Sequence, residues 1–408
     1  MAQDTAYGRI SVRAGRAFIV AARRSAIGNF GGALAALSPR EIGAPIAKAV
    51  LADGKVAESG AVIDEVIVGN VLGAGHGMNI ARQIALDAGL SNSTPAYCVN
   101  RVCGSGLQAV MTAAQSVASG QSEIVLAGGV ESMSTSGFAS MNTRWGARMG
   151  NAELRDLMIS DGLTDAFHRY HMGVTAENIA EREKISRTEQ DEFAAQSQVR
   201  AEAAIAAGAF KGEIAAIPLM ERGKPAGEFA ADEYPRKGVT AESLSKLKPA
   251  FKKDGTVTAG NASGLNDGAA FLLVASEEAV KRFGFTPIVE VTGIAAAGVD
   301  PEVMGLGPVE AVKRLEQRSG IVRNAFERIE ANEAFAVQAL AVQRRLELDP
   351  AKVNVTGGAI ALGHPIGASG ARILVTLIHG LVRENQRLGL ATLCVGGGQG
   401  VAIAVARV

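Results

Sequence analysis

Short runs of apolar residues alternate with longer helix-forming stretches over the first third of the chain. Apolar runs typical of buried strands lie at residues 17–22, 65–70 and 124–129. A helix is predicted to begin after Ser38, because this N-cap type is followed by proline, and to continue to about Leu51. Strands that alternate with helices in this way favour a mostly parallel sheet with helices on both faces.

The pattern changes over residues 135–263, which are more polar and hold most of the irregular sequence. Ser186 and Glu189 have the spacing of a capping box, so one helix is expected there. The strand–helix rhythm resumes at residues 269–274. We therefore expect three parts: an N-terminal half formed by residues 1–134 and 264–286, an inserted loop domain at 135–263, and a C-terminal half at 287–408.

The two ends of the chain carry a similar succession of elements. A glycine-rich turn, a helix and a strand that ends in glycines follow one another at residues 103–129 and again at 363–398. The similarity lies in the order of the elements and is weak residue by residue. It indicates an α/β fold with a duplicated half.

Composition excludes several classes of function. The 408 residues are 48% hydrophobic, and 41 basic side chains balance 41 acidic ones, which gives no support for nucleic acid or an anionic membrane as partner. Three cysteines make no disulfide framework and fit a cytoplasmic location. We find no run of 18 apolar residues, no secretory signal in the first fifteen residues, no phosphate loop and no metal-ligand spacing, so no membrane span, metal or cofactor is expected.

Cys103 is the first candidate for chemistry. It lies in the glycine-containing turn at 100–106, directly before a helix-forming stretch, and would therefore stand at a helix N-terminus. Unpaired N–H groups and the helix dipole stabilise an anion at such a place and lower the pKa of a thiol. The alternative is a small buried cysteine in a tight turn.

Two further side chains could complete a site. His364 lies between Gly363 and Pro365 on a constrained loop that could present a base, although loop carbonyls could equally satisfy its ring. Cys394 ends a strand before three glycines, where a core cysteine is the alternative. Two separate thiols and one histidine indicate acyl transfer through a thioester, with the second thiol moving a proton at carbon.

Four motifs together resemble the thiolases, and the resemblance covers nearly the whole chain. They lie in family order at residues 100–110, 332–336, 363–365 and 394–400. The resemblance implies two similar α/β halves in a layered α-β-α-β-α arrangement with an inserted loop domain. It also implies a homotetramer, built as a dimer of dimers, that acts on coenzyme A thioesters without a cofactor.

The resemblance also implies a role for each matching residue. Cys103 would be the acylated nucleophile, and His364 would take the thiol proton and help to hold the thioester oxyanion. Cys394 would exchange a proton with the substrate α-carbon. Asn332 would anchor a water that joins His364 in one oxyanion hole, and the backbone N–H groups of Cys103 and Gly396 would form the second. Two such holes suit the chemistry, because the enolate and the tetrahedral intermediate each carry an oxyanion.

Residues 171–173 are similar to the His-Met-Gly motif of the short-chain acetoacetyl-CoA thiolases. Long-chain degradative members usually lack this histidine. For Arg236, whose match lies at the nucleotide end of coenzyme A, a solvated surface position is the alternative. The residues that match contacts to the acyl group or to coenzyme A are Leu163, His171, Met172, Arg236, Phe251, Ser263, Ala334 and Phe335.

The resemblance therefore implies an acyltransferase that joins two acetyl-CoA molecules into acetoacetyl-CoA and free CoA, or catalyses the reverse cleavage. A thiolase with broader 3-ketoacyl-CoA specificity is the nearest alternative. A CoA- or lipid-binding protein of this fold without catalysis is disfavoured, because all four reactive residues are present. A decarboxylating ketoacyl synthase is disfavoured by the second thiol at Cys394.

Overall fold

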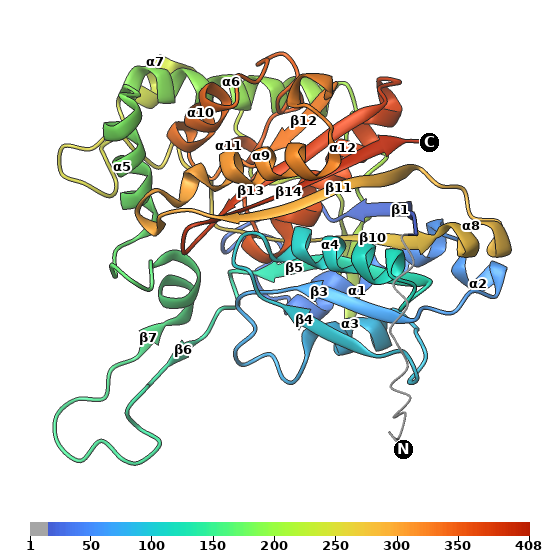
Figure 1. The fold of residues 1–408 in the computed structure, drawn as a ribbon. Helices are drawn as coiled ribbons and strands as arrows, with labels where there is room; N and C mark the ends of the chain where they lie inside the picture. Colours follow the sequence, from blue (N-terminus) through green and yellow to red (C-terminus); the bar gives the residue numbers. More distant parts are fainter. Residues whose placement is uncertain (1–14) are drawn as a thin grey trace, which may run out of the picture.

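Two helices lie side by side at the centre of the computed structural model, which describes residues 15–408 (Figure 1). They are α4 (Ser105–Ala118) and α12 (Ile366–Arg383), and their apolar side chains share one core with strands of both halves. Within this described range, α12 is the one helix long and apolar enough to cross a membrane, yet 83% of that stretch is buried inside the protein. We therefore interpret it as a core helix. The expectation about a secretory signal falls on residues 1–14, outside the described range.

The two halves repeat the same order of four strands, and the N-terminal half adds β4 at its outer edge. The order is β4-β3-β5-β10-β1 in the N-terminal half and β12-β13-β14-β11 in the C-terminal half, and a short pairing of β1 with β11 joins them into one sheet. The strands are β1 (Ala17–Arg24), β2 (Gly28–Asn29, paired with β10), β3 (Glu65–Gly69), β4 (Ala96–Val99), β5 (Ile124–Ser132), β10 (Asn266–Ser276), β11 (Val289–Gly298), β12 (Arg328–Ala331), β13 (Leu388–Val395) and β14 (Gln399–Arg407).

Outer helices complete the layers. The N-terminal strands pack against α1 and α3 on the face turned away from α4, and the C-terminal strands pack against α9 and α10. The order across the molecule is thus helices, strands, the central helices, strands and helices, as predicted. These helices, with the short ones beside them, are α1 (Pro39–Asp53), α2 (Val56–Ser59), α3 (Ile80–Asp87), α8 (Glu277–Phe283), α9 (Gly307–Ser319), α10 (Ala336–Arg345) and α11 (Ala359–Leu362).

The expectation of a mostly parallel sheet is wrong. Three pairs are parallel, β4 with β3, β3 with β5 and β12 with β13, but the pairs that follow in each half are antiparallel: β5 with β10 and β10 with β1, β13 with β14 and β14 with β11. For β13 and β14 the reason is the length of their connection. Three glycines at 396–398 join β13 to β14, and such a short turn can link only antiparallel strands.

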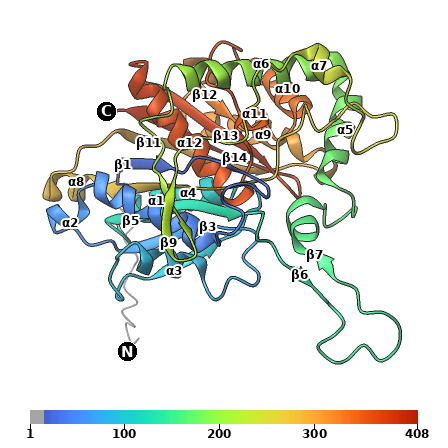
Figure 2. The same cartoon turned by 180° about the vertical axis from the view of Figure 1, so that it is seen from behind.

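The segment between β5 and β10 contains more regular structure than its sequence suggests. The predicted capping box at Ser186 and Glu189 is confirmed at the start of α6. The β6–β7 hairpin projects away from the rest of the molecule (Figure 1), and the β8–β9 hairpin lies near α1 (Figure 2). The elements are β6 (Phe138–Ala139), β7 (Arg155–Asp156), a π-helical turn (Met158–Leu163), α5 (Met172–Glu183), α6 (Arg187–Ala206), β8 (Ile217–Glu221), β9 (Lys224–Phe229) and α7 (Ala241–Ser245).

Candidate active site

The turn that carries Cys103 is held by its own side chains. The Ser105 hydroxyl accepts from the N–H of Arg101 (2.8 Å) and donates to the carbonyl of Val102 (2.7 Å), and Asn100 Oδ1 accepts from the N–H of Val102 (2.9 Å). Val102 has φ +44°, a conformation that β-branched residues rarely adopt. The hydrogen bonds hold this strained backbone in place. Because α4 begins at Ser105, the predicted position of Cys103 just before a helix is confirmed.

The predicted effect of that helix on the Cys103 thiol is wrong for the free protein. The pKa of Cys103 is raised to about 11, chiefly by burial and to a smaller extent by the charge of Glu131, although the N–H groups of Gly396 and of Cys103 itself act to lower it. Removal from water therefore outweighs the donors at the helix N-terminus. The resting side chain is a neutral thiol and needs a base before it can act as a nucleophile.

His364 is held in place by a residue of the other half. Its backbone N–H donates to Asn266 Oδ1 on β10 (2.9 Å), and Asn266 Nδ2 donates to the carbonyl of Gly28 (3.0 Å). Gly363 has φ +106°, and a Cβ at this position would lie 2.6 Å from the Asn266 amide carbon. The loop therefore requires glycine here, and the N-terminal half fixes the position of the histidine.

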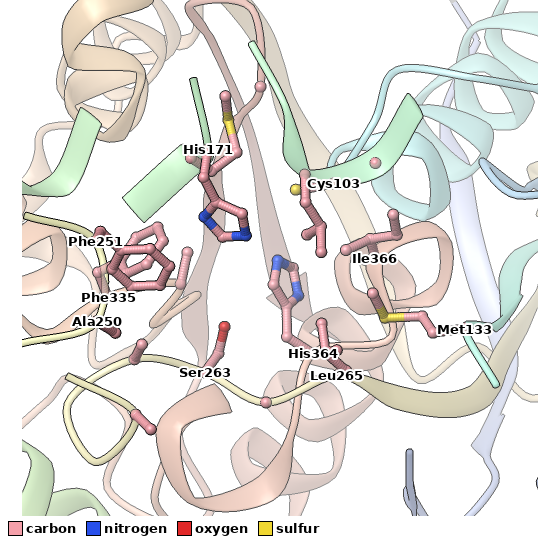
Figure 3. Close-up of a pocket in the computed structure, with 18 of the residues that line it drawn as sticks. Cys103, Met133, His171, Ala250, Phe251, Ser263, Leu265, Phe335, His364 and Ile366 are labelled. Carbon is pink, nitrogen blue, oxygen red and sulfur yellow. The ribbon is translucent and has the colours of Figure 1, made fainter. Parts of the chain in front are cut away.

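The His364 imidazole is directed into a pocket. Nδ1 lies 2.6 Å from Ser369 Oγ, while Nε2 has no hydrogen-bond partner among residues 15–408. Figure 3 shows this ring and the Cys103 sulfur facing the same space. Burial lowers the pKa of His364 to about 3, with a further contribution from the charge of Arg372, so the ring is neutral. A neutral imidazole is the form that can accept a proton.

Glycines let the N-terminal ends of the two central helices approach each other. A Cβ at Gly106 would lie 2.9 Å from the backbone nitrogen of Ala371, and a Cβ at Gly370 would lie 2.5 Å from the backbone nitrogen of Leu107. Any side chain at either position would force the helices apart. The close approach places the turns before α4 and α12, and with them Cys103 and His364, at one pocket.

Cys394 is the second-last residue of β13 and lies behind the residues that line the pocket. It is 1% exposed and packs in an apolar cluster with Met172 and Phe335, both of which line the pocket. Burial raises its pKa, and the proximity of Cys103 adds to the increase. Cys394 is therefore also a neutral thiol at rest.

Asn332 follows β12 and is 1% exposed. The N-cap of α10 is Phe335, so Asn332 does not cap that helix. Neither polar atom of its side-chain amide has a hydrogen-bond partner within the described part of the chain. A buried amide in this state needs a partner such as an ordered water.

One pocket of about 340 Å³ gathers the predicted substrate contacts. Its walls are largely apolar. The predicted residues that line it, together with Cys103, His364 and Gly396, are Leu163, His171, Met172, Arg236, Phe251, Ser263, Ala334 and Phe335.

His171 presents a second imidazole to this pocket (Figure 3). It is the N-cap of α5, where its Nδ1 accepts from the N–H of Gly173 (3.0 Å), and its ring stacks on Phe251 with 4.7 Å between ring centroids. Burial lowers its pKa, which favours the neutral ring. The cap and the stack together fix the direction of Nε2.

Sequence analysis missed several residues around the pocket. Glu131, which is fully buried, accepts from the backbone N–H groups of Leu72 (3.1 Å) and Gly367 (2.8 Å), and burial raises its pKa to about 7. Neither spacing nor composition distinguished these residues, because their importance depends on contacts between distant segments. The missed residues are Met133, Tyr234, Leu265, Met304 and Ile366 in the pocket wall, and Glu131, Asn266 and Ser369 behind it.

Comparisons with known proteins agree with this architecture. Residues 17–278 match the model of the thiolase N-terminal domain, and residues 285–407 match that of the thiolase C-terminal domain. An acetyl-CoA acetyltransferase of Allochromatium vinosum is 53% identical over 389 residues, which cover 95% of this chain and 98% of the relative.

Two solved structures extend the comparison. The Bacillus anthracis acetyl-CoA acetyltransferase superposes with a TM-score of 0.94 at 45% identity, covering 98% of this chain and 100% of that one. Human mitochondrial 3-ketoacyl-CoA thiolase in complex with CoA superposes with a TM-score of 0.92 at 42% identity, covering 97% and 99%. The chain therefore belongs to the thiolase family and is an acyltransferase enzyme.

Proposed function

We propose that this protein is an acetyl-CoA C-acetyltransferase that works through an acyl-enzyme on Cys103. The observation that carries the proposal is the convergence of Cys103, the neutral imidazole of His364 and two backbone N–H groups, of Cys103 and Gly396, in one pocket. A nucleophile, a base and oxyanion donors are the parts that acyl transfer requires.

In the cleavage direction, His364 Nε2 takes the proton of the Cys103 thiol, and the thiolate attacks the 3-keto carbon of acetoacetyl-CoA. The N–H groups of Cys103 and Gly396 stabilise the oxyanion that forms. The carbon–carbon bond then breaks, which leaves an acetyl group on Cys103 and the enolate of acetyl-CoA. Protonated His364 and a water on Asn332 hold the enolate oxygen.

Cys394 then supplies the proton that the enolate needs. Its raised pKa keeps it as a thiol, the form that can donate to carbon. The resulting thiolate takes the proton of incoming CoA, whose sulfur attacks the acetyl group and releases Cys103. The Cys103 sulfur recovers its proton from His364. Condensation of two acetyl-CoA molecules is the same sequence in reverse.

The residues that line the pocket support a preference for short acyl chains. Leu163, Met172 and Phe335 form part of its wall, and Phe251 fills the space between His171 and Phe335 with ring contacts of 4.7 and 6.2 Å between centroids. Because the thioester is held at Cys103, the added methylenes of a longer acyl chain would press against these side chains. The second candidate is a broader 3-ketoacyl-CoA thiolase, favoured by the structural similarity to the human mitochondrial enzyme of that name.

The proposal extends to assembly, domain division and location. Exposed apolar side chains on the projecting loop between β6 and β7, including Trp145 at 90% and Met149 at 97%, support a homotetramer. The place of β10 between β1 and β5 supports assigning residues 264–286 to the N-terminal half, with 135–263 as the inserted loop domain. We also propose a cytoplasmic location and no cofactor.

Steady-state cleavage rates with a series of 3-ketoacyl-CoA substrates test the proposal. Each methylene that the pocket cannot accommodate should reduce kcat/KM by about 10–200-fold. We expect kcat/KM to be highest with acetoacetyl-CoA and to fall steeply beyond 3-ketovaleryl-CoA. Equal efficiency with an eight-carbon substrate would replace the short-chain assignment by the broader one, and no cleavage of any 3-ketoacyl-CoA would reject both.

A further inference from the structure

The two imidazoles in the pocket have different partners at Nδ1. His171 Nδ1 lies 3.0 Å from the backbone N–H of Gly173, which can only donate. Its Nδ1 must therefore accept, and the proton of the neutral ring is on Nε2, which faces the pocket. His364 Nδ1 instead lies 2.6 Å from the hydroxyl of Ser369, which can either donate or accept.

The surroundings of Ser369 decide between these two possibilities. Its hydroxyl oxygen also lies 2.9 Å from the carbonyl of Pro365, which can only accept. If Ser369 donates to Pro365, the ring must donate to Ser369 from Nδ1, and each short contact contains one hydrogen. If Ser369 donates to the ring, the contact with Pro365 sets two acceptors against each other. Both side chains are buried, so an unmatched contact is costly.

We propose that Ser369 is a positioning residue that fixes His364 as the Nδ1–H tautomer, leaving the lone pair of Nε2 free to accept the proton of Cys103. His171 and His364 then present opposite groups to the same pocket, a hydrogen from one and a lone pair from the other. The inference rests on the proposed function, in which His364 is the base for Cys103.

The tautomer explains how one nitrogen serves in two steps. In the resting enzyme Nε2 has no hydrogen and can accept one from the thiol. After it has done so, both ring nitrogens carry protons: Nδ1–H stays bonded to Ser369, and Nε2–H donates to the enolate oxygen. When Nε2 returns the proton to the Cys103 sulfur, the ring is again the Nδ1–H tautomer. No proton has to move between the two ring nitrogens.

A purely structural role for Ser369 makes a different prediction. Serine in a helix often bonds the carbonyl four residues earlier, as Ser369 does with Pro365, without any further function. In that case Ser369→Ala would change stability alone. In our proposal the same change leaves a buried Nδ1–H without an acceptor, so the hydrogen moves to Nε2, which faces the pocket.

The direct test is nitrogen NMR of the intact enzyme labelled with ¹⁵N-histidine, with signals assigned by substituting each of the five histidines. We expect the wild-type His364 signal to be that of a neutral ring protonated at Nδ1, and the His171 signal that of one protonated at Nε2. Ser369→Ala should move the His364 hydrogen to Nε2. A wild-type His364 protonated at Nε2 would overturn the proposal, even if Ser369→Ala does not fold.

Kinetics provide the second readout. Ser369→Ala should slow single-turnover acetylation of Cys103 by about 10²–10⁴-fold, the range for loss of a general base. The KM measured in the steady state should change little. Thr376→Val is the matched control, because it removes another buried hydroxyl of α12, the one that donates to Glu213 (3.0 Å); it should keep the rate. An unchanged rate in Ser369→Ala would contradict the proposal.

The NMR and kinetic outcomes separate this proposal from the proposed function. If wild-type His364 is the Nδ1–H tautomer but acetyl-CoA leaves no acetyl group on Cys103, the proposed function fails and the assigned tautomer stands. If Cys103 is acetylated but His364 carries its hydrogen on Nε2, the role of Ser369 fails and the acyl-enzyme stands.

Discussion

The turns before α4 and α12 occupy corresponding places in the two halves but carry different chemistry. Cys103 stands two residues before Ser105, the first residue of α4, and His364 stands two residues before Ile366, the first residue of α12. Because the two helices pack side by side, a repeated unit brings its two turns together. The repeat thus supplies the geometry, and in the proposed mechanism the difference between thiol and imidazole gives the two turns their separate roles as nucleophile and base.

The two turns are also held differently. Asn100 and Ser105 close the first turn from within, whereas Asn266 of the N-terminal half holds the second. Burial favours the uncharged form of both side chains: the pKa of Cys103 is raised to about 11, and that of His364 is lowered to about 3. Both groups are therefore neutral at rest, and charge separates only when the proton moves between them.

Replacing Cys103, the residue that distinguishes the first turn, should have the largest effect on activity. Cys103→Ser removes the thiolate, and we expect cleavage of acetoacetyl-CoA to fall on the order of 10⁶-fold, as when a covalent nucleophile is removed from a hydrolase. Steady-state thiolysis measures it. Cys98→Ser on β4 is the control and should keep its rate. Comparable losses in the two variants would show that the first turn does not carry the nucleophile.

Cys394→Ala tests whether the second thiol acts separately from the two turns. Loss of a general acid should slow cleavage and condensation by about 10²–10⁴-fold while Cys103 still becomes acetylated. Acetylation, read by mass spectrometry, serves as the internal control for folding and binding. Near wild-type turnover would remove Cys394 from the mechanism.

Gly370→Ala tests the close approach of the helices. The added Cβ would meet the backbone nitrogen of Leu107 at 2.5 Å, so the turns must separate, and misplacement of about 1 Å can cost about 10²-fold in rate. Gly137→Ala is the control, because nothing lies within 4 Å of its added Cβ. Equal kcat values in the two variants would argue against a geometric requirement.

Met172→Ala should have the smallest effect and should act on specificity. Shortening this part of the pocket wall is expected to raise the efficiency for 3-ketohexanoyl-CoA relative to acetoacetyl-CoA by about tenfold. The ratio of the two kcat/KM values measures it, and Met220→Ala, at a position 58% exposed on β8, is the control. An unchanged ratio would place the limit on chain length elsewhere.

Sequence predicted the duplicated α/β halves, the helix after Cys103, the N-cap before α1 and the capping box before α6. Local signals suffice for these, since caps and glycine turns are read over a few residues. The predicted residues that line the pocket came from the resemblance to the thiolases. The antiparallel pairing of β10 was not predicted, because it depends on how the chain returns after the segment that precedes it.

The protonation state of the Cys103 thiol could also not be predicted from the sequence. A helix N-terminus indicates a lowered thiol pKa, but the degree of burial reverses the sign at Cys103, and burial is a property of the assembled fold. Asn266 and Ser369 both contact His364, from which they are separated by 98 and 5 residues along the chain. No spacing rule identifies these two contacts.

The central claim is that the first turn carries the nucleophile and the second carries the base. Brief incubation with acetyl-CoA, acid quenching and peptide mass spectrometry test it most directly, in the wild type and in His364→Ala. We predict one acetyl group in the wild type, on Cys103, and a much slower appearance of the same group in His364→Ala. An acetyl group found only on Cys98 or Cys394, or equal rates in the two proteins, would contradict the account.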